Sequence, residues 1–155
     1  MQPFRGPGQP PSNKWPSRDP SIIGKEDWQV HESEEGHFSL LLPTEPVDLK
    51  TRLGAAWMAK TADVTVLLVS GPLQEADKGK DAKSLLKERA DKDLTILKNL
   101  QLQGQPGIEM TDAKGTRLVR NYLITGWYFN IVVDTTPRVV DRKLADKIFD
   151  SFELR

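Results

Sequence analysis

Alternating apolar and polar positions, punctuated by glycine and proline, predict a chain built mainly from short β-strands. The clearest pattern runs from Thr116 to Asp134, where two segments rich in β-branched and aromatic residues flank Thr125-Gly126. Glycine tolerates the left-handed backbone of a two-residue hairpin turn. We therefore predict one long hairpin in which Ile124 faces Trp127. Neither of its faces is cleanly polar, so we expect cover on both sides and a central place in a sheet.

Further strands are predicted at residues 28–31, 38–42, 47–53, 55–61, 64–70 and 108–111. The segments 47–53 and 55–61 form a predicted hairpin around Gly54. The run from Val64 to Ser70 is nearly continuous in apolar residues, as expected for a strand buried on both faces, and Gly71-Pro72 is expected to end it.

A helix is predicted over residues 81–100, where apolar residues recur at the three- and four-residue spacing of one helical face. Asp81 is the expected N-cap, and the helix is expected to end in a loop at residues 104–107. Asp93 interrupts the apolar stripe one turn from Arg89. Two interpretations of Asp93 are open. It forms an ion pair with Arg89 at the border of the helix, or its carboxylate has a functional role.

A second helix is predicted near the end of the sequence. Thr136 and Pro137 suit the N-cap and the first helical position. Arg138, Arg142 and Asp146 are expected to point away from the apolar face of this helix. After it, Phe152 is the expected last side chain of the core.

The order of elements is strands, a helix, strands, a helix, with short turns between strands. This order predicts an α+β fold, a mainly antiparallel β-sheet flanked by two helices with one helix for each face. Residues 1–20 hold six of the eleven prolines. We therefore expect a proline-rich flexible tail or linker at residues 1–21 and a single domain at residues 22–155. A proline motif for an aromatic groove is the alternative reading of the tail.

Charge and composition exclude several classes of function. The 22 basic and 22 acidic residues cancel and are interspersed, which is not the basic footprint of a nucleic-acid-binding protein. Without cysteine there is no thiolate nucleophile and no cysteine-based zinc site. No apolar run reaches the roughly 18 residues needed to cross a bilayer, so we expect a soluble chain. We also expect a monomer.

The compartment is left open by the sequence. A cytoplasmic protein is expected if Met1 is the natural start. An extracytoplasmic or membrane-tethered protein is expected if an upstream segment has been removed.

Arg120 is the most informative charged residue. The predicted hairpin places it between Leu118 and Tyr122 on the more apolar face, where a guanidinium needs a carboxylate. Asp93 and Glu109 are the candidates. Arg120 then has either a structural or a functional role. In the structural role it forms an internal ion pair or extends its guanidinium to the edge of the sheet. In the functional role it anchors a ligand.

Aromatic residues offer a second candidate site. Trp57, Trp127 and Tyr128, with Met58, would form an exposed patch for a partner, although core packing is the commoner fate of such residues.

Two histidines, His31 and His37, could approach each other across a strand pair, with Glu34 or Glu35 nearby. A metal site would need a third fixed ligand, so we expect surface histidines, no metal and no cofactor.

Several short motifs occur in an order and spacing that resemble a known family. They are Glu35-Gly36-His37-Phe38-Ser39, Leu42-Pro43, Pro46, Pro106-Gly107-Ile108-Glu109, Tyr122, Gly126-Trp127-Tyr128 and Ser151-Phe152. Over residues 26–155 the chain resembles the PsbP-like α/β/α sandwiches. This fold is shared by the oxygen-evolving extrinsic protein of photosystem II and the Ran-binding Mog proteins. The small bacterial members of the superfamily, mostly of unassigned function, are the most similar.

The resemblance implies a binding or assembly role, because members of this fold are chiefly known in such roles, and it brings no catalytic set. We therefore expect a non-enzymatic module that binds a protein partner, not yet identified, through a sheet edge or the aromatic patch. The rival hypothesis is a small-ligand carrier or hydrolase, with a pocket between sheet and helix near Arg120 and Asp93.

Overall fold

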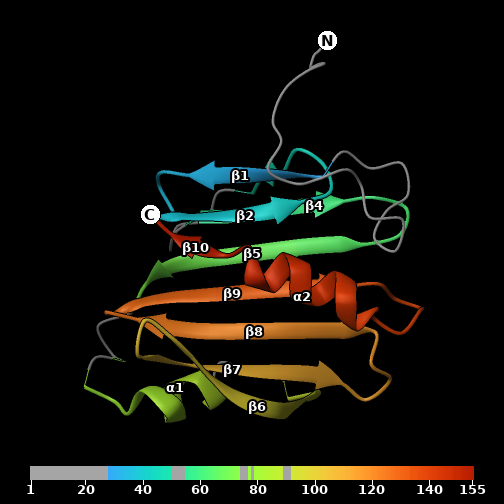
Figure 1. The fold of residues 1–155 in the computed structure, drawn as a ribbon. Helices are drawn as coiled ribbons and strands as arrows, with labels where there is room; N and C mark the ends of the chain where they lie inside the picture. The colour runs from blue at the N-terminus through green and yellow to red at the C-terminus, as the bar shows by residue number, and fades with distance from the viewer. Residues whose placement is uncertain (1–27, 50–54, 74–76, 78, 89–91) are drawn as a thin grey trace.

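The computed structural model describes residues 28–49, 55–73, 77, 79–88 and 92–155 (Figure 1). The predicted tail and the predicted turn at Gly54 lie outside these residues. Ten strands and two helices are described. A three-stranded sheet has the order β1 (Gln29–Ser33), β2 (Phe38–Leu42), β10 (Glu153–Leu154). A seven-stranded sheet has the order β3 (Val47–Asp48), β4 (Ala55–Lys60), β5 (Thr65–Pro72), β9 (Trp127–Asp134), β8 (Arg117–Ile124), β7 (Gln105–Asp112), β6 (Leu94–Leu102). All strand pairs within both sheets are antiparallel.

The predicted hairpin is the centre of the larger sheet, as expected. Ile124 pairs with Trp127 at one end and Arg117 pairs with Asp134 at the other. Thr125 and Gly126 have φ values of 49° and 77°. Both residues are therefore left-handed, the conformation of the two-residue turn that matches the twist of antiparallel strands.

Each face of the hairpin belongs to a different apolar cluster, because successive side chains of a strand point to opposite faces. Helix α2 (Arg142–Asp150) contributes Leu144, Ala145, Ile148 and Phe149 to the cluster that contains Tyr122 and the inner side chains of β2. Helix α1 (Ala82–Glu88) contributes Leu85 and Leu86 to the cluster that contains Leu123. Figure 1 shows α2 lying over β8 and β9, with α1 near the β6–β7 end of the sheet.

Phe152 lies in the core, as the sequence predicts. Its ring stacks on Tyr122 at 5.8 Å between centroids and meets Phe129 edge-on at 5.2 Å. Because Phe152 directly precedes β10, this aromatic cluster joins the two sheets.

The predicted helix over residues 81–100 is wrong in its second half. Helix α1 ends at Glu88, and residues 94–102 form strand β6. Gln103 and Gly104, with φ values of 53° and 77°, form a tight turn that folds β6 back onto β7. Leucines three residues apart fit a helix and an irregular strand alike, and pairing with β7 decides between them.

The predicted loop at residues 104–107 is confirmed only at Gly104, which lies in the turn, because β7 already begins at Gln105. Gly107 lies within this strand, opposite Tyr122. A Cβ atom added at Gly107 would lie 2.5 Å from Cδ1 of the Tyr122 ring. The glycine is there because an aromatic ring packs directly over the backbone.

The second helix starts later than predicted. Asp141 is its N-cap, and the Asp141 side chain accepts a hydrogen bond from the backbone N–H of Lys143. Thr136 instead donates its N–H and hydroxyl to Asp134 Oδ1 at the end of β9. The capping chemistry of Thr136 is therefore used in a turn, and Pro137 lies in the segment before the helix.

The early strands follow the prediction with shifted ends. Strand β5 ends at Gly71-Pro72, as predicted, but both residues are still paired in the sheet, Pro72 with Trp127, so the strand extends past Ser70. Its residues alternate between buried and half-buried, so only one face is fully covered.

Candidate functional site

Glu109 is the most deeply buried charged group among the described residues, with 1 % of its surface exposed. It lies on β7 directly opposite Arg120 of β8. Arg120 Nε donates to Glu109 Oε1 at 2.8 Å. Of the two carboxylates predicted as partners of Arg120, Glu109 is therefore the one that forms the ion pair.

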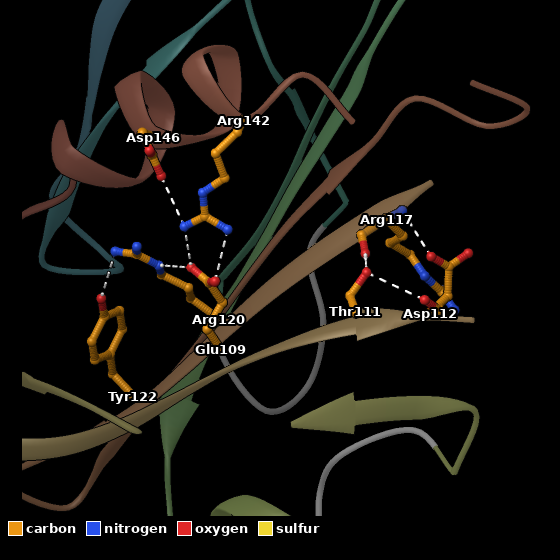
Figure 2. A network of polar contacts seen from close by, with 8 residues as sticks. All are labelled: Glu109, Thr111, Asp112, Arg117, Arg120, Tyr122, Arg142 and Asp146. Atoms are coloured by element: carbon orange, nitrogen blue, oxygen red, sulfur yellow. Dashed lines mark hydrogen bonds and ion pairs between the residues drawn. The ribbon is translucent and has the colours of Figure 1, made fainter. Parts of the chain in front are cut away.

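Helix α2 brings a second arginine to the same carboxylate (Figure 2). Arg142 Nη1 donates to Glu109 Oε2, and Arg142 Nη2 donates to Oε1, both at 2.8 Å. Arg142 Nη2 also lies 2.9 Å from Asp146 Oδ1, one helical turn further on. Two planar groups joined by two parallel hydrogen bonds form an ion pair that is stronger than neutral hydrogen bonds and specific in its geometry.

Arg142 was expected to point away from the core, and that prediction is wrong. The helical spacing already indicates a position near the core, because Arg142 precedes Ala145 by three residues and Phe149 by seven. Such positions share one stripe of a helix with those buried residues. The Arg142 side chain is 43 % exposed, so it lies at the border of that stripe with one edge in water.

The two arginines control the ionisation of Glu109. Burial alone would raise the pKa of this carboxyl group. Hydrogen bonds from Arg142 and Arg120, together with their positive charges, outweigh burial and hold the pKa of Glu109 below its usual value. Glu109 is thus a stable carboxylate and a poor general acid or base near neutral pH.

The remaining surroundings of Arg120 hold its guanidinium in place. Its Cζ lies 4.6 Å from the centroid of the Phe149 ring, in a cation–π contact. Its Nη1 donates to the Tyr122 hydroxyl at 3.4 Å. Arg120 therefore connects β7, β8 and α2 by polar and aromatic contacts.

Asp93 is not part of this cluster of side chains. It lies exposed in the turn before β6, and the next residue, Leu94, pairs with Asp112. Glu109 pairs with Lys98, further along β6. The predicted pair between Asp93 and Arg89 involves a residue outside the described ranges.

A second polar cluster, also drawn in Figure 2, shapes the turn between β7 and β8. Asp112 Oδ1 accepts hydrogen bonds from the backbone N–H groups of Thr116 and Arg117 at 2.8 and 3.1 Å. Although burial opposes it, hydrogen bonding from Thr116 and Arg117 lowers the pKa of Asp112. The geometry is that of a turn-stabilising aspartate.

The four aromatic and sulfur-containing candidates do not share one face. Trp57 meets Phe38 edge-on at 5.0 Å, and Trp57 and Trp127 both pack against the cluster under α2. Tyr128 packs against the cluster under α1, on the other face. Met58 is half-buried, as are the other three. Trp127 Nε1 is buried with no hydrogen-bond partner in the part of the chain that the structure describes.

The two histidines have different environments. His37 meets Trp127 edge-on at 5.3 Å, whereas His31 lies on β1 opposite Leu40. Burial lowers the pKa of His31, and the nearby Glu45 charge opposes that shift only in part. Within the described residues, no three histidine, aspartate or glutamate side chains gather in a way that could hold a metal ion.

Exposed apolar side chains are concentrated at the two edges of the seven-stranded sheet. Among the described residues, five large hydrophobic side chains are exposed. Ile96 and Leu97 lie on the edge strand β6, and Val47 and Leu49 lie on or beside the opposite edge strand β3. The fifth, Val139, lies in the segment before α2.

Comparison with known proteins defines a class by fold. No family model matches the chain, and no curated protein matches it. Solved structures do match, and one of them shows that the chain has a PsbP-like fold. One of them is the solution structure of cyanobacterial PsbP (CyanoP) from Synechocystis sp. PCC 6803. It aligns with a TM-score of 0.55 and 13 % identity, covering 86 % of this chain and 95 % of CyanoP. At this identity the likeness is one of fold.

Neither helix of the described residues is long and apolar enough to cross a bilayer.

Proposed function

We propose that this chain is a non-enzymatic protein-binding or assembly module of the superfamily that contains the PsbP-like and Mog-like α/β/α sandwiches. Within that superfamily, we place it with the small bacterial members of unassigned function. The likeness to CyanoP supports the fold part of this proposal. The partner is a protein, and the chain acts on it by binding.

One observation carries the functional part. Four of the five large apolar side chains that the described residues expose lie at the two sheet edges. An edge strand presents unpaired backbone N–H and C=O groups, which are the groups used when an extended partner segment joins a sheet. Apolar side chains beside such groups supply contact area for the same partner.

The rival function, a small-ligand carrier or hydrolase near Arg120 and Asp93, has less support. It needs an arginine whose donors face a ligand. Arg120 instead bonds Glu109 and Tyr122 and lies over Phe149. A carboxylate held ionised by two arginines is also a poor acid–base catalyst.

Capture of partners from the source cell tests the proposal. The full chain, an Ile96→Lys variant and a Val47→Lys variant serve as baits, each placing a charge at one sheet edge. Val139→Lys is the matched control, since Val139 is 71 % exposed but lies at neither edge. We expect a protein captured by the parent and the control and lost with one edge variant.

Two results would contradict the proposal. The first is a set of captured proteins that is identical for all four baits. The second is a small molecule that co-purifies with the parent and is lost from Arg120→Leu. That second result would favour the ligand-carrier hypothesis. Capture with residues 22–155 alone separates binding by the domain from binding by the proline-rich segment.

A further inference from the structure

Strand β6 is the longest edge of the molecule's sheets within the described residues. It has nine residues and pairs with β7 alone among the strands that the structure describes. In Figure 1 it lies at the bottom of the sheet. The opposite edge strand, β3, has only two residues. Since strand addition gains affinity from successive backbone hydrogen bonds, β6 offers the larger template.

The side chains of β6 divide between its two faces. Ile96 pairs with Met110, which belongs to the cluster under α1. Lys98 pairs with Glu109, whose side chain lies under α2. A segment added to β6 would therefore meet an apolar side chain on one face and a cation on the other.

Both oxygens of the Glu109 carboxylate already accept hydrogen bonds from Arg120 and Arg142. Glu109 therefore does not neutralise the charge of Lys98. Lys98 is exposed at the edge on the same face as this cluster, and the three cations Lys98, Arg120 and Arg142 exceed the two carboxylates of Glu109 and Asp146 by one charge. The local excess of positive charge is complementary to an acidic residue on an incoming strand.

We infer that β6 binds an extended segment of a partner protein by strand addition, with an apolar side chain next to Ile96 and a carboxylate next to Lys98. This inference rests on the proposed binding function and specifies its surface and the chemistry of the partner.

A second copy of this chain fits β6 poorly. In the antiparallel register that pairs all nine residues, Lys98 would lie directly opposite Lys98 of the other copy, and like charges in that position repel. The pairing of β6 with β7 also shifts between Ile96 and Lys98, which leaves Leu97 as a bulged residue with 50 % exposure. Bulges and lysines are devices that prevent indiscriminate edge pairing, so β6 selects its partner.

Synthetic strands provide the probe. Two fluorescein-labelled nine-residue peptides alternate valine and threonine around a central residue, which is Glu in one and Lys in the other. A third is the Glu peptide N-methylated at alternate amides, which removes backbone donors. Binding to the full 155-residue chain is measured by fluorescence anisotropy, and circular dichroism confirms that each variant is folded.

The parent should bind the Glu peptide about five- to tenfold more tightly than the Lys peptide, because attraction replaces repulsion at one position. N-methylation should abolish binding. Lys98→Glu should reverse the preference, and Ile96→Lys should weaken both peptides. Val139→Lys should bind like the parent.

The inference is overturned if the parent does not distinguish the peptides, if the N-methylated peptide binds equally, or if Val139→Lys weakens binding as much as Ile96→Lys. It is also overturned if sedimentation shows a dimer of the parent that Ile96→Lys dissociates, since a second copy would then occupy β6. Failure here, combined with partner capture lost from Val47→Lys, would leave the proposed function intact and move it to the β3 edge.

Discussion

Arg142 on α2 and Glu109 on β7, 33 residues apart in sequence, are joined by two hydrogen bonds of 2.8 Å each. The pair fastens the second helix to the sheet at a point where Arg120 also bonds the carboxylate. Apolar packing of α2 has no direction along the sheet, whereas a two-pronged ion pair fixes both position and rotation. This contact therefore fixes the position and rotation of α2 relative to the sheet.

The first prediction concerns Arg142. Arg142→Ala should lower the free energy of unfolding by about 1.5–3 kcal/mol, the range for hydrogen bonds to charged groups. Lys143→Ala is the matched control, because Lys143 is the next residue and is exposed. Urea melts measure both. Equal losses for the two variants would show that the Arg142–Glu109 pair adds nothing beyond helix propensity.

The second prediction concerns Arg120. Arg120→Ala removes its hydrogen bond to Glu109 and its contact with Phe149. We expect a loss of about 3 kcal/mol, the lower end for breaking a buried ion pair, since Arg142 still neutralises Glu109. The exposed pair of Arg138 with Asp63 provides the comparison. Arg138→Ala should cost about 0–1 kcal/mol. A small loss for both would mean that Arg120 is worth no more than a surface arginine.

The central hairpin could be predicted because its information is local. The Thr125-Gly126 turn and the alternation around it determine every pair from Ile124–Trp127 to Arg117–Asp134. The placement of Arg120 on the face under α2 followed from that register. The choice between Asp93 and Glu109 did not, because it depends on how residues 94–112 fold.

The sequence pattern of residues 94–102 predicts a helix, whereas the interactions that make this segment strand β6 are with residues outside it. Leu94, Leu97 and Leu100 have helical spacing, and the bulge at Leu97 breaks the alternation that marks a strand. The turn at Gln103-Gly104 and pairing with β7 override that spacing. Arg142 was missed for a different reason: a charged residue beside a buried stripe looks exposed unless its buried partner is known.

The third prediction concerns the aromatic junction between the sheets. Phe152→Ala removes a ring that stacks on Tyr122 and contacts Phe129, so it leaves a cavity in the core. Truncations of this kind cost about 3–5 kcal/mol. Val139→Ala, which removes an exposed side chain, should change the free energy of unfolding by less than about 0.5 kcal/mol. If Phe152→Ala melts with the parent, Phe152 does not join the sheets.

The fourth prediction is a pH dependence of stability. The pKa of Glu109 is lower in the folded protein than its ordinary value of 4.5. A carboxyl group of this kind contributes its full stability above the unfolded pKa. That contribution is lost as pH falls through the folded pKa, where the native carboxylate must take up a proton. The parent should therefore lose stability steadily as pH falls below about 4.5.

Glu109→Gln tests the assignment, because glutamine cannot titrate. Urea melts from pH 7 to pH 2.5 should show a lower stability at neutral pH and a flatter decline in acid. Asp112 also has a pKa below its ordinary value of 3.8, so part of the decline should remain in Glu109→Gln. Adding Asp112→Asn should remove most of the rest. A decline in Glu109→Gln as steep as that of the parent would mean that other carboxylates cause the acid sensitivity, and that the two arginines do not hold Glu109 ionised.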